Sequence, residues 1–303
     1  MNHGKWFCIT GTVIGDSHSR KGTGNQDAIS SCELTGKSDR HILAVADGHG
    51  SPGCARSDVG AKLAVEVAIE ILVNFCSKLD DRGIDFQSRK PSSIQLNSIL
   101  SMLRNDVPID LAELWGERVA KHLQENPLDL NIRVDNLKLL YGTTVIALVV
   151  SDEFILCLQL GDGDILIVNS DQTVSHLFSE AATKIGDETH SLCLPECHKR
   201  FNVEFRLINS HLDFPKAILV CTDGFSNAFK SEDSFRKAAT DFCQLLETSS
   251  GQETVRNSLS TWLREYSSFS GDDVSVGLLS RSNATETTSL NIDKLQNEPH
   301  IST

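Results

Sequence analysis

The sequence predicts an α+β fold with a mostly antiparallel β-sheet core. Short runs of apolar and β-branched residues, separated by turns that contain Gly and Asp, are typical of antiparallel strands. Segments with helical periodicity form separate blocks rather than alternating singly with these strands, which indicates the α+β class. The chain has 303 residues, of which 40% are hydrophobic and 23% are charged, the values of an ordinary globular protein.

The strands are expected where apolar runs of strand length occur. Their ranges are Trp6–Ile14, His41–Ala46, Thr143–Val150, Phe154–Leu160, Ile165–Asn169, Phe201–Ile208, Ala217–Cys221 and Val274–Leu279. We interpret the three runs between 143 and 169 as an antiparallel meander, with Asp162 in a hairpin turn. Residues 15–25 are expected to form a polar loop.

Helices are expected at Ser57–Ser77, Ile94–Arg104, Pro108–Gln124, Glu232–Glu247 and Glu253–Tyr266. In the first of them the polar positions are spaced by four and draw one narrow stripe, so this helix is expected to lie between other layers. The stripe consists of Lys62, Glu66, Glu70 and Asn74. Residues 1–280 are expected to form one domain, and residues 281–303, rich in Ser, Thr and Asn, a mobile tail.

Composition excludes several classes of protein. A net charge of −13 argues against nucleic acid or an anionic membrane as a partner. No apolar run approaches the roughly 20 residues of a membrane span, and the N-terminus lacks the pattern of a signal peptide. Nine cysteines without paired spacing are expected to be reduced thiols in a cytoplasmic protein. His190, Cys193, Cys197 and His198 lack a second paired motif, so a zinc site is disfavoured.

Carboxylates recur at the ends of the expected strands. Asp47, Asp162 and Asp223 each follow an apolar run and precede a glycine, whereas Asp272 precedes a strand. Hairpin chemistry alone explains an Asp-Gly pair, and this alternative is strongest for Asp162. If the carboxylates converge, two charges about 4 Å apart repel by roughly 4 kcal/mol, so cations must neutralise them. Oxygen ligands favour Mg²⁺ or Mn²⁺, and such ions suit the hydrolysis of a phosphate monoester.

Six sequence blocks occur in the order seen in metal-dependent protein phosphatases of type 2C (the PPM family), which this chain resembles from about residue 10 to 280. The blocks are Asn25-Gln26-Asp27-Ala28, Asp47-Gly48-His49-Gly50, Gly142-Thr143-Thr144, Gly161-Asp162-Gly163, Cys221-Thr222-Asp223-Gly224 and Gly271-Asp272-Asp273-Val274-Ser275. The resemblance implies a four-layer β-sandwich of two mostly antiparallel sheets, flanked by helices, with metals in a cleft at one edge.

The resemblance also implies a ligand set for two Mg²⁺ or Mn²⁺ ions. Asp47 resembles the carboxylate that bridges both ions, with the carbonyl of Gly48 on one of them. Asp27 resembles a further ligand of that same ion. Asp223 and Asp272 resemble the ligands of the other ion.

Other site residues follow the family less closely. Asp162 resembles a residue that helps to hold a third ion in some members, and His49 matches the histidine proposed as general acid for the leaving alkoxide. The family usually carries a phosphate-binding arginine at the position of Gly22. Arg20, Lys21 or His18 is a candidate to replace it, and Arg20 is preferred because its planar fork binds phosphate oxygens in pairs. A solvated basic loop is the alternative.

The function implied by the resemblance is a protein-serine/threonine phosphatase in which a metal-bound hydroxide attacks a phosphoprotein substrate directly. Asp273, where the family commonly has Asn, and the unassigned segment 179–200 suggest a divergent, bacterial-looking branch. Two alternatives stay open. One is a pseudophosphatase or regulatory binding module that keeps the fold, and the other is a phosphatase of a small phosphorylated metabolite.

Overall fold

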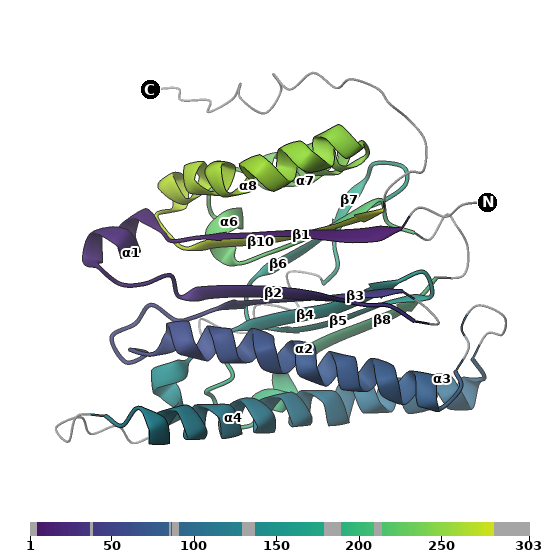
Figure 1. Cartoon of the computed structure of the whole chain (residues 1–303), viewed down its shortest axis with the longest axis horizontal. Helices are drawn as coiled ribbons and strands as arrows, with labels where there is room; N and C mark the ends of the chain where they lie inside the picture. Colours follow the sequence, from purple (N-terminus) through teal and green to yellow (C-terminus); the bar gives the residue numbers. More distant parts are fainter. Residues whose placement is uncertain are drawn as a thin grey trace.

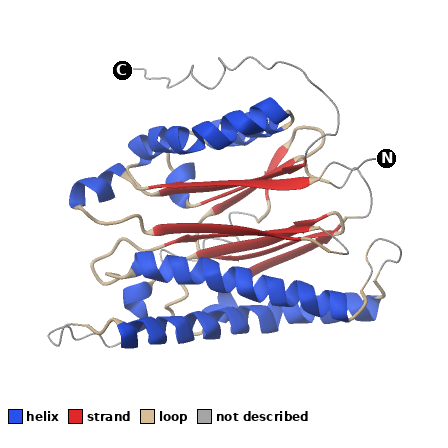
Figure 2. Ribbon diagram, viewed as in Figure 1, coloured by secondary structure: helices blue, strands red, loops and turns tan. Residues whose placement is uncertain are grey.

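The computed structural model describes residues 5–36, 39–84, 86, 91–128, 137–178, 189–208 and 214–281. Two β-sheets lie face to face, and helices cover the outer face of each, so the chain forms four layers (Figures 1 and 2). This arrangement confirms the α+β sandwich. Residues 282–303 of the expected tail lie outside the described residues.

Each sheet has five strands, and every pairing within the two sheets is antiparallel. The first sheet has the order β1 (Trp6–Val13), β10 (Val274–Arg281), β9 (Ala217–Cys221), β6 (Asp164–Val168) and β7 (Val174–His176). The second has the order β2 (Asp27–Leu34), β3 (Arg40–Asp47), β4 (Val145–Ser151), β5 (Phe154–Leu160) and β8 (Asn202–Leu207).

Helices cover the two outer faces (Figure 1). Those on the second sheet are α2 (Ser57–Asp81), α3 (Ser93–Ser101) and α4 (Val107–Glu125). Those on the first sheet are α7 (Glu232–Leu246) and α8 (Ser249–Ser270). Two short helices, α1 (Asp16–Lys21) and α6 (Asp223–Ser226), lie at one end of the sandwich. None of the helices described here combines the length and the apolar character that a membrane crossing requires.

Strand β3 shows how the layers pack. Its side chains alternate between the two faces of the sheet, as the period of a strand requires. Ile42 and Ala44 pack in the core beneath the helices, whereas Leu43 and Val45 pack between the two sheets. Both faces are buried, which explains why the sequence of β3 reads as a continuous apolar run.

The packing of α2 confirms its prediction. The four polar positions of its stripe, Lys62, Glu66, Glu70 and Asn74, are exposed. On the buried side, the indole Nε1 of Trp115 donates a hydrogen bond of 3.0 Å to the carbonyl of Gly60, which fixes α4 against α2.

The predicted meander is wrong at its third strand. β4 pairs with β5, but β6 pairs with β7 and β9 in the other sheet. The chain passes between the sheets at Gly161, whose φ of 111° is available mainly to glycine. Asp162 therefore lies on a crossover between sheets and not in a hairpin turn.

Other segments also differ from the prediction. The expected polar loop contains α1, and β2 and the short β7 were not predicted. The two helices expected at 94–104 and 108–124 run into each other through a π-helical turn at Met102–Asp106. Pro108 lies in the first turn of α4, directly after this π-helical turn, so the irregular turn falls where the missing N–H of Pro108 breaks the regular hydrogen-bond pattern.

Candidate metal centre

Asp27 and Asp47 meet at one end of the second sheet. Asp27 is the first residue of β2, Asp47 is the last residue of β3, and the two are register partners. Register partners point to the same face of a sheet. In β3 this is the face of Val45, two residues before Asp47, which packs between the sheets. Both carboxylates are therefore directed into the space between the layers.

The first sheet brings Asp223 and Asp272 to the same end. Asp223 begins α6 directly after β9, and Asp272 lies between α8 and β10. Thr222 joins the two sheets, because its Oγ1 donates a hydrogen bond of 2.7 Å to Oδ2 of Asp27 and accepts one of 3.0 Å from the backbone N–H of Ser275.

The charges of these groups act on one another. Burial, followed by the charges of Asp27, Asp223 and Asp272, raises the pKa of Asp47 well above its usual value. Burial likewise raises the pKa of Asp27 well above its usual value, and the charge of Asp273 and, less strongly, that of Asp272 add to the rise. Burial also raises the pKa of Asp223, and the charges of Asp162 and Asp272 add to this rise. The four predicted ligands therefore lie in one neighbourhood, and their ionised forms need positive charge.

The backbone around Asp47 is held tightly. Its N–H donates to Oγ1 of Thr144 at 3.0 Å, and its carbonyl accepts from the N–H of Thr144 at 2.8 Å. Gly48 follows at a point where an added Cβ would lie 2.6 Å from the carbonyl oxygen of Gln26 and 2.7 Å from that of Ser57. Only glycine fits this close approach, so the position of the Gly48 carbonyl is fixed.

His49 and Asp162 lie beside the four carboxylates. The N–H of His49 donates to the carbonyl of Gly142 at 3.0 Å. Burial lowers the pKa of His49, and the charge of Asp162 opposes this shift. Oδ2 of Asp162 accepts a hydrogen bond of 2.9 Å from Oγ1 of Thr189. Asp162 is thus close enough to His49 and to Asp223 for its charge to influence the pKa of each.

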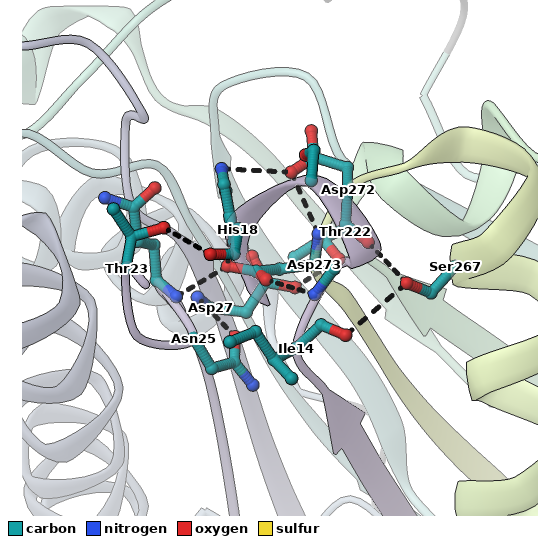
Figure 3. A network of polar contacts seen from close by, with 12 residues as sticks. Ile14, His18, Thr23, Asn25, Asp27, Thr222, Ser267, Asp272 and Asp273 are labelled. Carbon is teal, nitrogen blue, oxygen red and sulfur yellow. Dashed lines mark hydrogen bonds and ion pairs between the residues drawn. The ribbon is translucent and has the colours of Figure 1, made fainter. Parts of the chain in front are cut away.

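The two candidates for phosphate binding are placed differently. His18 faces Asp272 and Asp273, as Figure 3 shows. Arg20 is exposed, and its Nε donates to the carbonyl of Asp16 in its own helix at 3.0 Å. Gly22 ends α1 with a φ of 70°, a left-handed conformation in which arginine would be strained. The absence of arginine at position 22 is thus tied to the shape of this turn.

The sequence did not indicate the role of Asp273. Its carboxylate, 2% exposed, accepts hydrogen bonds of 2.6 Å from the N–H groups of Gly15 and Gln26. These bonds join three distant segments directly behind the expected ligands. The one available signal was the second carboxylate of the Asp272-Asp273 pair. Burying this carboxylate would cost free energy unless hydrogen-bond donors bound it.

The zinc alternative gains no support. Cys193 and Cys197 are buried free thiols, and burial raises the pKa of each. Among the described residues, neither of them belongs to a group of three metal-binding side chains with adjacent donor atoms.

The donor set fits divalent cations of the Mg²⁺ and Mn²⁺ type. It consists of carboxylates together with a fixed backbone carbonyl, the ligands that hard cations prefer. Within the described part of the chain, no three of the carboxylates Asp27, Asp47, Asp162, Asp223 and Asp272 have oxygens within 4.8 Å of one another. Cation binding is therefore expected to draw them closer together, as the removal of their mutual repulsion allows.

Comparison with known proteins agrees with this geometry. The sequence profile described as protein phosphatase 2C matches residues 14–264. A solved bacterial serine phosphatase is 16% identical, with a TM-score of 0.53, over 93% of this chain and 100% of that chain. The serine/threonine phosphatase Stp1 from Staphylococcus aureus is 17% identical, with a TM-score of 0.53, over 93% of this chain and 98% of that chain.

At these identities the solved structures show likeness of fold, and no curated protein matches the sequence. The sequence profile spans more than half of the chain and includes five of the six blocks that surround the carboxylates. The chain is therefore a member of the protein phosphatase 2C family, whose members are metal-dependent serine/threonine phosphatases.

Proposed function

We propose that this protein is a protein-serine/threonine phosphatase that uses two Mg²⁺ or Mn²⁺ ions. Asp27, Asp47, the carbonyl of Gly48, Asp223 and Asp272 would hold the ions. The observation that carries the proposal is the convergence of four carboxylates from two sheets, with raised pKa values on the three most enclosed of them. Asp162, which acts on Asp223, would help to hold a third ion.

Each group has a separate task in this reaction. Bound cations would neutralise the carboxylates and the phosphate, and would lower the pKa of a water molecule that attacks the phosphorus in line. His49 would donate a proton to the leaving oxygen of the serine or threonine. Burial lowers the pKa of His49 and so disfavours the protonated form that this role requires, whereas the nearby charge of Asp162 opposes the shift.

Arg20 is the preferred candidate to bind the phosphate of the substrate. A guanidinium can bind two phosphate oxygens at once, and Arg20 lies on α1, the helix that carries His18 to the carboxylates. To bind phosphate, Arg20 must give up its hydrogen bond to the carbonyl of Asp16. Breaking this hydrogen bond costs little free energy, because the bond is exposed and water can replace the lost partner.

A phosphopeptide assay tests the proposal. The chain, freed of metal by a chelator, should hydrolyse phosphoserine and phosphothreonine peptides only after Mn²⁺ or Mg²⁺ is added. Glu66→Gln, on the exposed face of α2, is the control for a lost carboxylate and should keep the full rate. A rate that persists in excess chelator would exclude metal-dependent catalysis.

A pseudophosphatase is the second candidate. The observation that favours it is Gly22, whose left-handed turn leaves no arginine at the usual position. The same assay separates the two, since a pseudophosphatase would bind Mn²⁺ without hydrolysing any of the peptides. Hydrolysis of small phosphorylated metabolites in preference to the peptides would instead indicate a metabolite phosphatase.

A further inference from the structure

His18 lies between the two carboxylates that precede β10. Its Nδ1 is 2.9 Å from Oδ2 of Asp273, and its Nε2 is 3.9 Å from Oδ1 of Asp272 (Figure 3). Within the described residues, these three side chains are the one group of three potential metal ligands whose donor atoms all lie within 4.8 Å of one another. The family resemblance gives no role as a metal ligand to a histidine in this position.

The position of the imidazole is fixed by its surroundings. Asp273 is held by the N–H groups of Gly15 and Gln26, so its carboxylate has little freedom to move. Helix α1 is tied to the loop before Asp272, because the N–H of Ser17 donates to the carbonyl of Gly271 at 3.0 Å. Nδ1 of His18 is buried and lies in ion-pair contact with Asp273, although the two groups are not aligned for a hydrogen bond.

The other ring nitrogen, Nε2, lies near the loop that follows Asp47. A Cβ added to Gly50, in the loop that follows Asp47, would lie 3.5 Å from Nε2 of His18 and 3.2 Å from Oε1 of Gln26. That oxygen of Gln26 is itself buried and has no hydrogen-bond partner. Nε2 is therefore close to Asp272, which we have proposed as a ligand, and to the loop that carries Gly48.

We propose that Nε2 of His18 is a nitrogen ligand of the cation that Asp272 holds. Contact with the buried carboxylate of Asp273 favours a proton on Nδ1, which leaves the lone pair on Nε2 free to bind metal. Two ligand atoms that are each about 2.1 Å from one ion can be at most about 4.2 Å apart, and the observed 3.9 Å lies within this limit. Metal-binding histidines commonly direct their second ring nitrogen at a carboxylate, as His18 does.

This proposal rests on the cation centre proposed above and adds a preference among cations. Imidazole binds Mn²⁺ and the later transition metals better than Mg²⁺, which favours all-oxygen sites. His18 would therefore bias the site towards Mn²⁺, and Arg20 would be left as the phosphate-binding candidate on α1. A histidine that acts only as a cationic partner of the carboxylates, or of the phosphate, would give no such bias.

The experiment is pulsed electron paramagnetic resonance on the full chain, without an affinity tag and freed of its own metal, with Mn²⁺ as the only addition. We expect modulation of the Mn²⁺ signal by a directly bound ¹⁴N nucleus. The signal should disappear in His18→Gln. It should persist in His176→Gln, a matched control in which a histidine also lies between two carboxylates, Asp164 and Glu232.

A competition between Mn²⁺ and Mg²⁺ gives a second readout. His18→Gln should reduce the preference for Mn²⁺ over Mg²⁺ by about tenfold or more, since loss of even an outer-shell partner weakens metal binding by about 10- to 100-fold and imidazole favours Mn²⁺. His176→Gln should keep the wild-type preference.

The outcomes separate the two proposals. If wild-type protein binds Mn²⁺ without a ¹⁴N signal, or if the signal survives in His18→Gln, the role of His18 is overturned while the carboxylate centre stands. If wild-type protein binds no Mn²⁺, the cation centre itself is wrong. The wild-type spectrum needs no variant, so it decides the matter even if His18→Gln does not fold.

Discussion

Asp27 and Asp47 lie directly opposite each other in the antiparallel pair of β2 and β3. Side chains opposite each other on one face of a sheet have Cβ atoms about 5 Å apart, and like charges in such a pair are destabilising. A protein that places two partly enclosed carboxylates in this register needs a compensating positive charge. The candidate metal centre provides a reason for the arrangement, and it leads to five tests.

The first test is Asp47→Asn. This change removes the charge that lies among Asp27, Asp223 and Asp272. Turnover of a phosphoserine peptide should fall by orders of magnitude, because the proposed bridging ligand is lost. In chelator, the free energy of unfolding should rise, because the amide carries none of the negative charge that burial and the neighbouring carboxylates disfavour. Peptide hydrolysis and urea unfolding measure the two effects, and a near-normal turnover would exclude Asp47 as a ligand.

The second test is the pH dependence of stability without metal. Burial raises the native pKa of Asp27 and Asp47 above the value of 3.8 that an unperturbed aspartate has. The native state therefore holds protons that the unfolded chain has already released. Stability from these groups is fully present below about pH 4 and is lost as the pH rises through the native pKa values.

Melting temperatures in chelator, measured against pH, check this expectation. The difference between wild type and Asp27→Asn isolates the carboxylate, because the other titrating groups are common to both proteins. Asp27→Asn should gain stability over wild type as the pH rises, and Mn²⁺ should abolish that gain. A difference that shrinks with rising pH in chelator would contradict the prediction.

The third test is Gly48→Ala. The added Cβ would lie 2.6 Å from the carbonyl oxygen of Gln26 and 2.7 Å from that of Ser57, so the loop must move. We expect a loss of about 1–3 kcal/mol in the free energy of unfolding, together with weaker Mn²⁺ binding. Gly24→Ala is the matched control in the neighbouring loop, because a Cβ there meets nothing within 4 Å. Equal effects of the two substitutions would refute a special role of Gly48.

The fourth test is His49→Gln, assayed on two substrates. Loss of a general acid should slow hydrolysis of a phosphoserine peptide by about 100-fold or more, because an alkoxide leaves poorly. Hydrolysis of an aryl phosphate, whose leaving group needs no proton, should be much less affected. Equal losses on both substrates would indicate that His49 positions other groups and does not donate the proton.

Much of the fold could be predicted because its elements carry strong local patterns. In α2 the polar residues recur with the period of a helix and lie on its exposed face, and in β3 the continuous apolar run matches a strand that is buried on both faces. Strand β2 was missed because it contains no continuous apolar run, and its residues after Ala28 are half-buried or exposed. Helix α1 was missed because it has no apolar face, and tertiary bonds such as that from Ser17 to Gly271 hold it.

The third strand of the expected meander was wrong for a different reason. A short apolar run shows that a strand exists, but not which sheet it joins. Gly161 turns the chain towards the other sheet, and an Asp-Gly sequence looks the same in a crossover as in a hairpin.

The residues of the candidate site also fall into two groups, those that the local sequence predicts and those that depend on tertiary packing. Asp47 and Asp223 could be found because each follows an apolar strand and precedes a glycine. The contact between His18 and Asp273 could not, since it depends on how α1 packs against a loop from the opposite end of the chain. The proposed role of Arg20 in phosphate binding likewise depends on the conformation of its exposed side chain, which no periodicity constrains.

The most direct test of the carboxylate centre is equilibrium dialysis of the metal-free chain against Mn²⁺. The wild-type protein and Asp171→Asn, a control for an exposed carboxylate in the turn between β6 and β7, should each bind at least two ions per chain. Asp47→Asn should bind fewer. If the wild-type protein binds none, or if Asp47→Asn binds as many as the control, the carboxylates do not form a metal centre.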